Sequence, residues 1–395
     1  MEKILNFWSK YWRLVFVGLF VAIVAYVLLF RGISTLTGGY ASAELSSQQQ
    51  SASLRYIYEN PVNAPYKLMV WGALKLDHHS LAVTRIAAAL FAVMVAVLFY
   101  WVALHWYSKR VALLSTLLFI SSSGFLHIGR NGSGLVLQMA TLVLISCVLL
   151  YRRVRQETAV AYIIALVLAT CLYIPGMIWF ELIGLVIMRK RIASMFSKLG
   201  HVHTWVIFIL GTVPVLPLLW MGVRDVSILR EVSGLPATLL SPLQLLDNAL
   251  HLGSSVVYRG YWPTDHWMYG APLLNLGEAI LLLAGLLVLV RRPILRGNYF
   301  LIGTLLTATA LIVLGGSVSI AMLIPLVYLT IAGGVYYLLD QWLEVFPRNP
   351  FARFIGVALI LLLAGCSVFY HLKAYYTAWP NAPETKSVYI VKQPM

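Results

Sequence analysis

Long apolar runs follow one another along most of this 395-residue chain, separated by short polar segments. The hydrocarbon core of a bilayer is about 30 Å thick, and a helix needs roughly 20 apolar residues to cross it. The pattern predicts an all-α polytopic membrane protein, with 1–395 forming a single transmembrane domain. We expect eleven transmembrane helices, at 12–30, 82–104, 111–128, 134–151, 159–174, 176–188, 204–222, 271–290, 299–315, 318–339 and 352–371.

Basic residues gather at alternate ends of these runs. Cytoplasmic loops of membrane proteins carry an excess of Lys and Arg. With eleven spans and a cytoplasmic N-terminus, the six basic clusters all fall on the cytoplasmic side and the C-terminus lies outside. The clusters are Lys3/Lys10/Arg13, Lys109/Arg110, Arg152/Arg153/Arg155, Arg189/Lys190/Arg191, Arg291/Arg292/Arg296 and Arg348/Arg353. One missed helix would break this agreement, so the charges support the predicted count.

Two outer segments, 31–81 and 223–270, are long, whereas the outer tail 372–395 is short. In the first we expect two short amphipathic helices, Glu44–Tyr58 and Ala64–Leu76, the second lying in the membrane interface. The second segment is rich in Tyr and Trp, which favour the headgroup zone. Aromatic rings also stack on sugars, but an aromatic belt is the simpler interpretation.

Composition agrees with a membrane protein and excludes a soluble domain. Hydrophobic residues make up 61% of the chain and charged residues 11%, against roughly 25% charged residues in soluble domains. The net charge of +15 is explained by the basic ends of the apolar runs, so no nucleic acid partner is expected. The first run is too long for a signal peptide. Together with the short loops, this favours a multi-pass protein of the plasma (inner) membrane.

Several short motifs occur in an order that matches a known family. They are Gly-Tyr-Ala-Ser-Ala-Glu-Leu at 39–45, Asn-Ala-Pro-Tyr at 63–66, Thr-Arg-Ile at 84–86, Phe-Leu-His-Ile-Gly-Arg at 125–130 and Ile-Pro-Leu at 324–326. With these motifs and its long first outer loop, the chain resembles the GT-C glycosyltransferases. More narrowly, it resembles the protein mannosyltransferase and aminoarabinose transferase group over most of its length.

This resemblance implies a GT-C-like helical bundle with juxtamembrane helices in the first outer loop. It also implies an enzyme that transfers a sugar from a polyprenyl-phosphate donor, with inversion, to an acceptor on the outer face of the bilayer. The acceptor would be a glycan, a lipid or a protein.

The sequence departs from the family pattern at several positions. Ala43 stands where the family carries an Asp before the Glu, and 131–134 lack the Asp expected after Arg130. The basic residue before the proline turn is Asn63, and no Arg occurs in 317–323. Two alternatives therefore stay open: a noncatalytic GT-C-like subunit for lipid binding or assembly, and a lipid or sugar transporter. The absence of internal repeats argues against the transporter.

The implied chemistry needs a carboxylate that accepts a proton and cations that offset the leaving phosphate. Glu44 is the candidate base, although it is also suited to a helix N-terminus. Arg130, Arg85 and Lys67 are the candidate donor phosphate ligands. For Arg130 and Lys67 the alternative is an interfacial anchor, and for Arg85 it is an ion pair with a buried carboxylate.

For the acceptor cavity the sequence offers Glu278, near the outer end of its span, and Tyr261, Trp262, Asp265 and His266 in the second outer segment. An ionisable residue such as Glu278 within an apolar run is costly and suggests a role.

No cofactor is firmly implied, and no metal ligand is assigned. The run Asp77-His78-His79 invites a metal interpretation, which leaves a divalent cation open. Adjacent histidines on a helix point in different directions, so they need a third ligand, for which Asp265-His266 is the candidate.

Overall fold

The computed structural model describes residues 19–76, 80–153, 158–291 and 298–390. Within these ranges the chain is helical and contains no strand, and one isolated bridge joins Gly260 to Gly270. The predicted all-α architecture is therefore confirmed. The start of the first predicted span and the run Asp77-His78-His79 lie outside the described residues.

The first half of the chain forms these elements: η1 (Tyr26–Phe30), α2 (Ser42–Gln50), α3 (Leu54–Glu59), α4 (Ala64–Leu74), α5 (Ala82–Trp106), α6 (Lys109–Ser121), α7 (Ser123–Gly129), η2 (Leu135–Ala140), α8 (Thr141–Arg153), α9 (Thr158–Cys171) and α10 (Met177–Phe196). The second half forms α11 (His201–Thr212), η3 (Val213–Val215), α12 (Leu216–Arg224), α13 (Val226–Ser233), α14 (Pro242–Val257), α15 (Leu276–Arg291), α16 (Asn298–Val313), η5 (Ile320–Met322), α17 (Ile324–Val345), α18 (Pro350–Lys373), η6 (Ala374–Ala378), α19 (Trp379–Asn381) and α20 (Pro383–Val388).

By length and composition, four described helices can cross a membrane: Ala82–Trp106, His201–Arg224, Ile320–Val345 and Pro350–Asn381. The bent pair α6 and α7 adds a fifth crossing if it counts as one span. Shorter apolar helices are Leu19–Phe30, Leu135–Tyr151, Thr158–Cys171 and Asn298–Val313. Each predicted span contains helix in its described part, but 271–275 at the start of the eighth span and 318–319 at the start of the tenth are not helical. The chain is a multi-pass membrane protein, while the count of eleven and the orientation of the termini stay predictions.

The third predicted span, 111–128, is not one continuous helix. It bends by 60° between α6 and α7. Ser122 at the bend has an extended backbone (ψ 140°), and its side chain accepts a hydrogen bond from the Phe125 amide. The Ser122 hydroxyl also donates to the Phe119 carbonyl at 2.7 Å. Because this serine satisfies backbone groups on both sides of the break, α7 can turn inward, where all its residues are buried.

The first outer segment contains three helices where the sequence predicted two. The predicted helix Glu44–Tyr58 is interrupted at 51–53, so the expected continuity was wrong. The Ser51 hydroxyl donates to the Ser47 carbonyl, and Ser53 caps α3 by accepting a hydrogen bond from the Tyr56 amide. Serine side chains compete for helical backbone groups in this way and favour caps over helix interiors.

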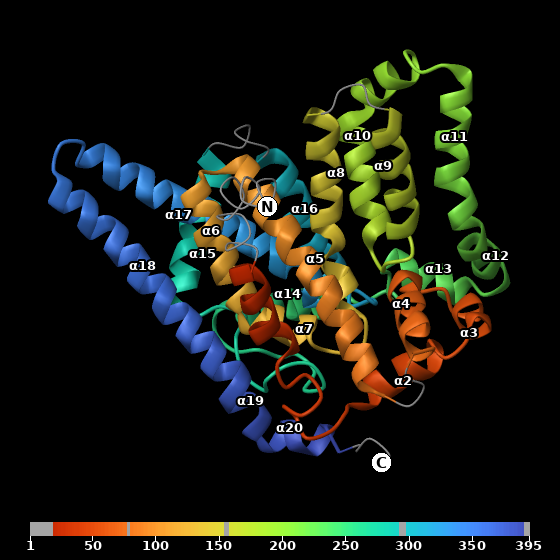
Figure 1. Ribbon diagram of the computed structural model, residues 1–395, viewed down its shortest axis with the longest axis horizontal. Helices are drawn as coiled ribbons and strands as arrows, with labels where there is room; N and C mark the ends of the chain where they lie inside the picture. Colours follow the sequence, from red (N-terminus) through yellow and green to blue (C-terminus); the bar gives the residue numbers. More distant parts are fainter. Residues whose placement is uncertain (1–18, 77–79, 154–157, 292–297, 391–395) are drawn as a thin grey trace, which may run out of the picture.

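The helices lie in two groups joined through α5 (Figure 1). On the right of Figure 1, α8 to α11 rise from α12 and α13, and α2 to α4 lie below them. On the left, α17 and α18 form a long hairpin, and the chain continues from α18 into α19 and α20 at the bottom of the view. The second outer segment also contains helices, α13 and α14, before an irregular stretch leads to α15.

Helices α15 and α17 approach closely at two glycines. A Cβ atom added to Gly285 would lie 2.0 Å from the Thr330 carbonyl oxygen, and one added to Gly334 would lie 2.0 Å from that of Leu281. Small residues let membrane helices pack backbone against backbone. This contact fixes the first half of α17, where Ile324–Val335 are buried, against α15.

We predict that Gly285→Leu separates α15 from α17 and destabilises the protein by about 1–3 kcal/mol or more, since overpacking forces the backbone apart. The thermal unfolding temperature in detergent measures the effect. The matched control is Gly365→Leu on α18, where an added Cβ meets no atom within 4 Å. Equal unfolding temperatures for the two variants would contradict the close packing.

Candidate functional site

One small cavity brings together three of the residues that the sequence nominated, Glu44, Arg85 and Arg130. Its volume is about 10 Å³, which is about the space that one water needs. Segments far apart in the chain form its wall: Ile33, Leu36, Thr37, Glu44, Arg85, His127, Arg130, Asn131, Tyr375, Trp379 and Tyr389.

Glu44 and Arg85 form a buried ion pair with two parallel hydrogen bonds. Arg85 Nε donates to Glu44 Oε1 and Arg85 Nη2 to Oε2, each at 2.7 Å. The residues are 0% and 3% exposed. Such bidentate pairs are among the strongest hydrogen-bonded contacts in proteins. The pair ties the first outer segment to the start of α5.

Backbone amides complete the surroundings of the Glu44 carboxylate. The Gly132 amide donates to Oε1 at 2.9 Å and the Ala41 amide to Oε2 at 3.1 Å. Gly132 approaches so closely that an added Cβ would lie 2.4 Å from the Thr84 hydroxyl. Together with the two N–H groups of Arg85, these amides make four hydrogen-bond donors to the carboxylate. In this conformation Glu44 holds three chain segments together and is not free to accept a proton from a substrate.

The Arg85 guanidinium is bound on its other sides as well. Nη1 donates to the Ile33 carbonyl at 2.9 Å, and Nη2 donates to the Gly39 carbonyl at 2.8 Å. The Tyr40 ring lies 4.2 Å from the guanidinium carbon. Burial raises the pKa of the Tyr40 hydroxyl, against the opposing charge of Arg85. Arg85 therefore organises the turn that leads into α2.

Arg130 reaches the cavity from the end of α7. Its Nη1 donates to the Leu28 carbonyl at 2.9 Å and to the Tyr376 hydroxyl at 3.0 Å, and Nη2 donates to the Arg31 carbonyl at 2.8 Å. No carboxylate pairs with it among the described residues. Arg130 thus brings an uncompensated positive charge to the cavity, as a phosphate ligand requires.

His127 also lines the cavity. It belongs to the motif at 125–130, but the sequence assigned it no role. It is 2% exposed, and its Nδ1 has no hydrogen-bond partner among the described residues. The rings of Trp267, Trp379 and Tyr375 surround it at centroid distances of 5.1, 4.5 and 4.9 Å. An imidazole with an unused nitrogen beside the cavity can accept a proton. Its position one helical turn before Arg130 is the one sequence signal that could have drawn attention to it.

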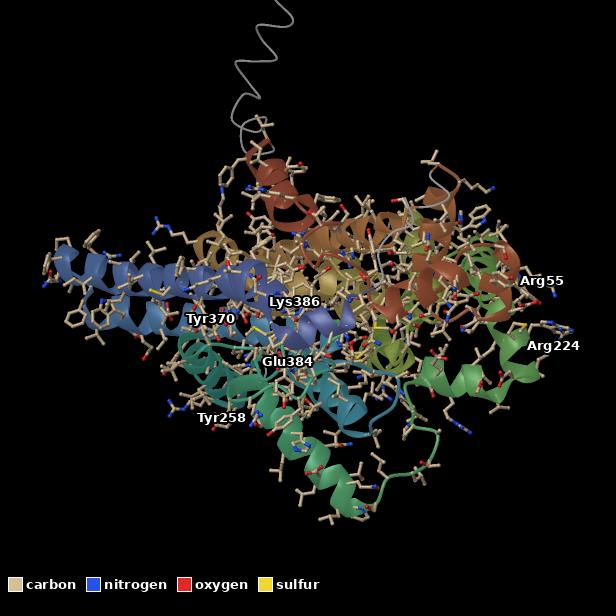
Figure 2. All side chains as sticks on the ribbon, turned by 90° about the horizontal axis from the view of Figure 1, so that it is seen from below. Arg55, Arg224, Tyr258, Tyr370, Glu384 and Lys386 are labelled. Carbon is tan, nitrogen blue, oxygen red and sulfur yellow. The ribbon has the colours of Figure 1, made fainter. Side chains whose placement is uncertain are left out.

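The C-terminal segment covers the cavity. Trp379 and Tyr389 are 4% and 5% exposed, and the Tyr389 hydroxyl donates to the Asp265 carbonyl. Burial raises the pKa of the Tyr389 hydroxyl well above its ordinary value. In Figure 2, Glu384 and Lys386 of the same segment lie near the middle of the face seen from below. This cover could not be predicted from the sequence, because residues 374–390 contain no motif.

Asp265 and His266 border the site from the second outer segment. The Asn131 side chain donates to the Asp265 carbonyl at 3.1 Å, and Asp265 Oδ1 lies 2.6 Å from His266 Nδ1. Burial acts to raise the pKa of the Asp265 carboxyl, but the contact with His266 outweighs it and lowers that pKa. Trp262 packs against Trp267, whereas Tyr261 is exposed and stacks on His251.

Lys67 does not line the cavity. It is 5% exposed, and its Nζ donates to the Asn60 carbonyl at 2.9 Å. Burial lowers the pKa of the Lys67 ammonium to about 8, against the opposing charge of Glu231. Lys67 thus anchors the turn before α4 in this conformation.

Glu278 lies in a separate buried network. His371 Nε2 is 2.7 Å from Glu278 Oε2, and His371 Nδ1 is 3.0 Å from the Ser123 hydroxyl. The Tyr328 hydroxyl donates to the same carboxyl oxygen at 3.2 Å. In a hydrolase triad the histidine presents Nε2 to the serine. Here the reverse holds: Nδ1 faces Ser123 and Nε2 faces the carboxylate, and all the groups are buried. We therefore interpret the network as a structural one that joins α7, α15, α17 and α18.

No group of three or more His, Cys, Asp or Glu side chains suited to a metal ion occurs in the described part of the chain. The run Asp77-His78-His79, which prompted the metal interpretation, is not among these residues.

We predict that Arg85→Ala destabilises the protein by about 3–5 kcal/mol, because the buried Glu44 carboxylate loses its counter-ion. Arg55→Ala is the matched control, since the Arg55–Glu59 pair is equally short at 2.8 Å but its arginine side chain is 83% exposed. Arg55 lies at the edge of the molecule in Figure 2. Exposed pairs contribute little. Chemical or thermal unfolding of both variants checks this, and similar losses would argue against a structural role for the Glu44–Arg85 pair.

A second prediction concerns Lys67. Its folded-state pKa of about 8 lies below its ordinary value of 10.5. Between these pH values the unfolded chain binds more protons than the folded chain, so stability rises with pH, by up to roughly 3 kcal/mol. Lys67→Met should remove this rise. Unfolding measured from pH 7 to 10.5 tests it, and an unchanged slope in the variant would refute the assignment.

No protein-family model and no curated protein sequence matches this chain. Among solved structures, it is similar to the archaeal oligosaccharyltransferase AglB from Archaeoglobus fulgidus, in complex with an inhibitory peptide and a dolichol-phosphate. The TM-score is 0.56 at 13% sequence identity, and the similarity covers 98% of this chain and 61% of AglB. The chain thus spans less than two thirds of the length of AglB. Over nearly its whole length, this chain has the GT-C fold.

Proposed function

We propose that the chain is a membrane glycosyltransferase that transfers a sugar from a polyprenyl-phosphate donor to an acceptor on the outer face of the membrane. The observation that carries this proposal is the cavity in which Arg130, Arg85, Glu44 and His127 meet. Arg130, which has no carboxylate partner among the described residues, suits a phosphate, and the unused imidazole nitrogen of His127 suits proton transfer.

The fold supports the same reaction class. AglB is an oligosaccharyltransferase whose structure holds a dolichol-phosphate and a peptide. A lipid-linked phosphate donor is therefore a reasonable substrate class for this chain. Fold alone does not fix function, so the residues of the cavity carry the argument for chemistry.

In the proposed reaction, an acceptor hydroxyl or amine attacks the anomeric carbon of the donor. A new bond from the acceptor to that carbon forms as the bond to the phosphate oxygen breaks, and the polyprenyl phosphate leaves with the electron pair. Arg130 offsets the phosphate charge. The acceptor proton passes to a base, and the configuration at the anomeric carbon inverts.

Two residues compete for the role of base. Glu44 has four donors on its carboxylate, so it becomes a base only if the donor phosphate draws Arg85 away from it. His127 already has an unused Nδ1 beside the cavity. Because a cavity of about 10 Å³ holds no sugar, donor binding also requires the segment that carries Trp379 and Tyr389 to move.

The second candidate function is a noncatalytic subunit that binds a lipid phosphate. Hydrogen-bond donors already occupy the Glu44 carboxylate, which favours this function, since an ion pair with this geometry stabilises the fold whether or not a reaction takes place. In that case the protein would bind the donor phosphate through Arg130 but would not transfer the sugar.

We predict that purified protein in nanodiscs transfers sugar from a polyprenyl-phosphate sugar to a membrane acceptor fraction, and that removing the base lowers the rate by about 100-fold or more. The comparison uses Glu44→Gln and His127→Gln, which keep size and polarity. Transfer rates with a panel of radiolabelled donors, and donor binding measured separately, provide the test.

A rate lost only in His127→Gln, with donor binding retained, assigns the base to His127. A rate lost only in Glu44→Gln assigns it to Glu44 if that variant still binds donor and unfolds at the wild-type temperature. Arg55→Gln serves as an exposed control and should react at the wild-type rate. Donor binding without transfer by the wild type would favour the noncatalytic subunit. A wild type that binds no donor would refute both functions.

A further inference from the structure

A second and much larger cavity lies between α8, α9, α10 and α11. Its volume is about 560 Å³, within the range of about 300–1,000 Å³ typical of ligand pockets. It shares no lining residue with the candidate active site. Side chains such as Leu168, Phe180, Met188 and Phe208 make its wall almost entirely apolar.

The shape of this cavity follows from its helices. On α10 the lining residues Glu181, Gly184, Met188, Ile192 and Met195 recur every three or four positions, which places them on one helical face. The neighbouring α11 exposes Trp205 and Phe208, as expected for a helix that faces hydrocarbon. An apolar cavity between helices of a membrane protein is accessible to lipid chains but not to polar solutes.

One end of the cavity is basic. Met188, Ile192 and Met195 line that end, and Arg189, Lys190 and Arg191 are interleaved with them and exposed. At 100° per residue, Arg189 and Arg191 flank the lining face of α10 on either side. The sequence has no acidic residue between Glu181 and Asp225, so α10 and α11 contribute only positive charge at this end.

We propose that this cavity binds an acyl chain of an anionic phospholipid, with the lipid phosphate held at the end where Arg189 and Arg191 flank the entrance. Apolar lining recognises the chain and the flanking cations recognise the headgroup. Basic residues close to a membrane surface attract anionic lipid by about 1 kcal/mol each.

The sugar donor is a poorer occupant. Its phosphate has to reach Arg130. In Figure 1, α2, which carries Glu44 of the candidate site, and α20 lie in the lower part of the view, whereas the C-terminal part of α10, which carries Arg189 and Arg191, lies at the top. A polyprenyl chain in this cavity would therefore place its phosphate at the wrong end. The site is independent of the proposed function and would exist in a noncatalytic protein as well.

Glu181 is the acidic exception in the wall. One of its carboxyl oxygens has no hydrogen-bond partner among the described residues. Glu181 lies on α10 two turns before Met188, away from the basic end. It would therefore face the part of the lipid acyl chain that is farthest from the headgroup. A charged carboxylate next to hydrocarbon is costly. Replacing it by Leu should therefore leave chain binding intact or strengthen it.

Native mass spectrometry of the full chain, purified in detergent and incubated with phosphatidylglycerol or with phosphatidylcholine of identical acyl chains, tests the site. We expect the wild type to retain phosphatidylglycerol preferentially. Gly184→Phe should lose the bound lipid, because an added Cβ at Gly184 meets no atom within 4 Å and the ring enters the cavity without a clash. The matched control is Gly365→Phe, which has the same freedom on α18, outside the cavity.

Two further variants separate chain from headgroup. Arg189→Gln with Arg191→Gln should still retain lipid but lose the preference for phosphatidylglycerol, and Glu181→Leu should retain it as the wild type does. Unfolding temperatures confirm that each variant is folded. Retention of lipid by Gly184→Phe, or equal retention of both lipids by the wild type, would overturn the proposal. Displacement of phosphatidylglycerol by stoichiometric polyprenyl phosphate would overturn it in favour of the donor.

Discussion

The ion pair between Glu44 and Arg85 holds one half of this protein together. Two opposite charges can be buried away from water only when they pair with each other and hydrogen bonds occupy their remaining donor and acceptor positions. Here the filling comes from backbone: the Gly132 and Ala41 amides on the carboxylate, and the Ile33 and Gly39 carbonyls on the guanidinium. The turn before α2, the start of α5 and the loop after α7 are therefore fixed by one contact, and the cavity exists where they meet.

The buried network of Glu278 plays a similar part in the other half. Through His371, Ser123 and Tyr328 it joins α15 and α18 to α7 and α17, beside the glycine contact between α15 and α17. Both networks include or adjoin α7, the short helix that carries His127 and Arg130. Polar groups buried in an apolar molecule thus determine where the reactive side chains stand, and hydrophobic packing fills the space between them.

Hydropathy was sufficient to predict helix within the apolar runs, because the length of an apolar run can be read directly from the sequence, but it did not predict α13, α14 or α20. It did not show the bend at Ser122 or the breaks at 51–53, which depend on serine side chains that replace backbone hydrogen bonds. Glu44, Arg85 and Arg130 could be nominated together through motif order, and all three line one cavity. The role of Trp379 and Tyr389 could not be anticipated, since their contacts with His127 and Asp265 join residues 252 and 124 positions apart and leave no local pattern. The same holds for Glu278, whose partner His371 lies on another helix.

The cavity wall runs from Ile33 to Tyr389. During synthesis the Glu44–Arg85 pair can form once α5 has been inserted, but the wall stays open until nearly all of the chain has left the ribosome. In a partly synthesised chain, the cations that are buried in the folded protein are therefore exposed at the membrane surface, and the aromatic lining of the cavity is incomplete. Insertion of α18, which brings the segment with Tyr375, Trp379 and Tyr389 to the cavity, is then the committing event of assembly, and defects in α18 should be recognised by quality control as failures of the whole molecule.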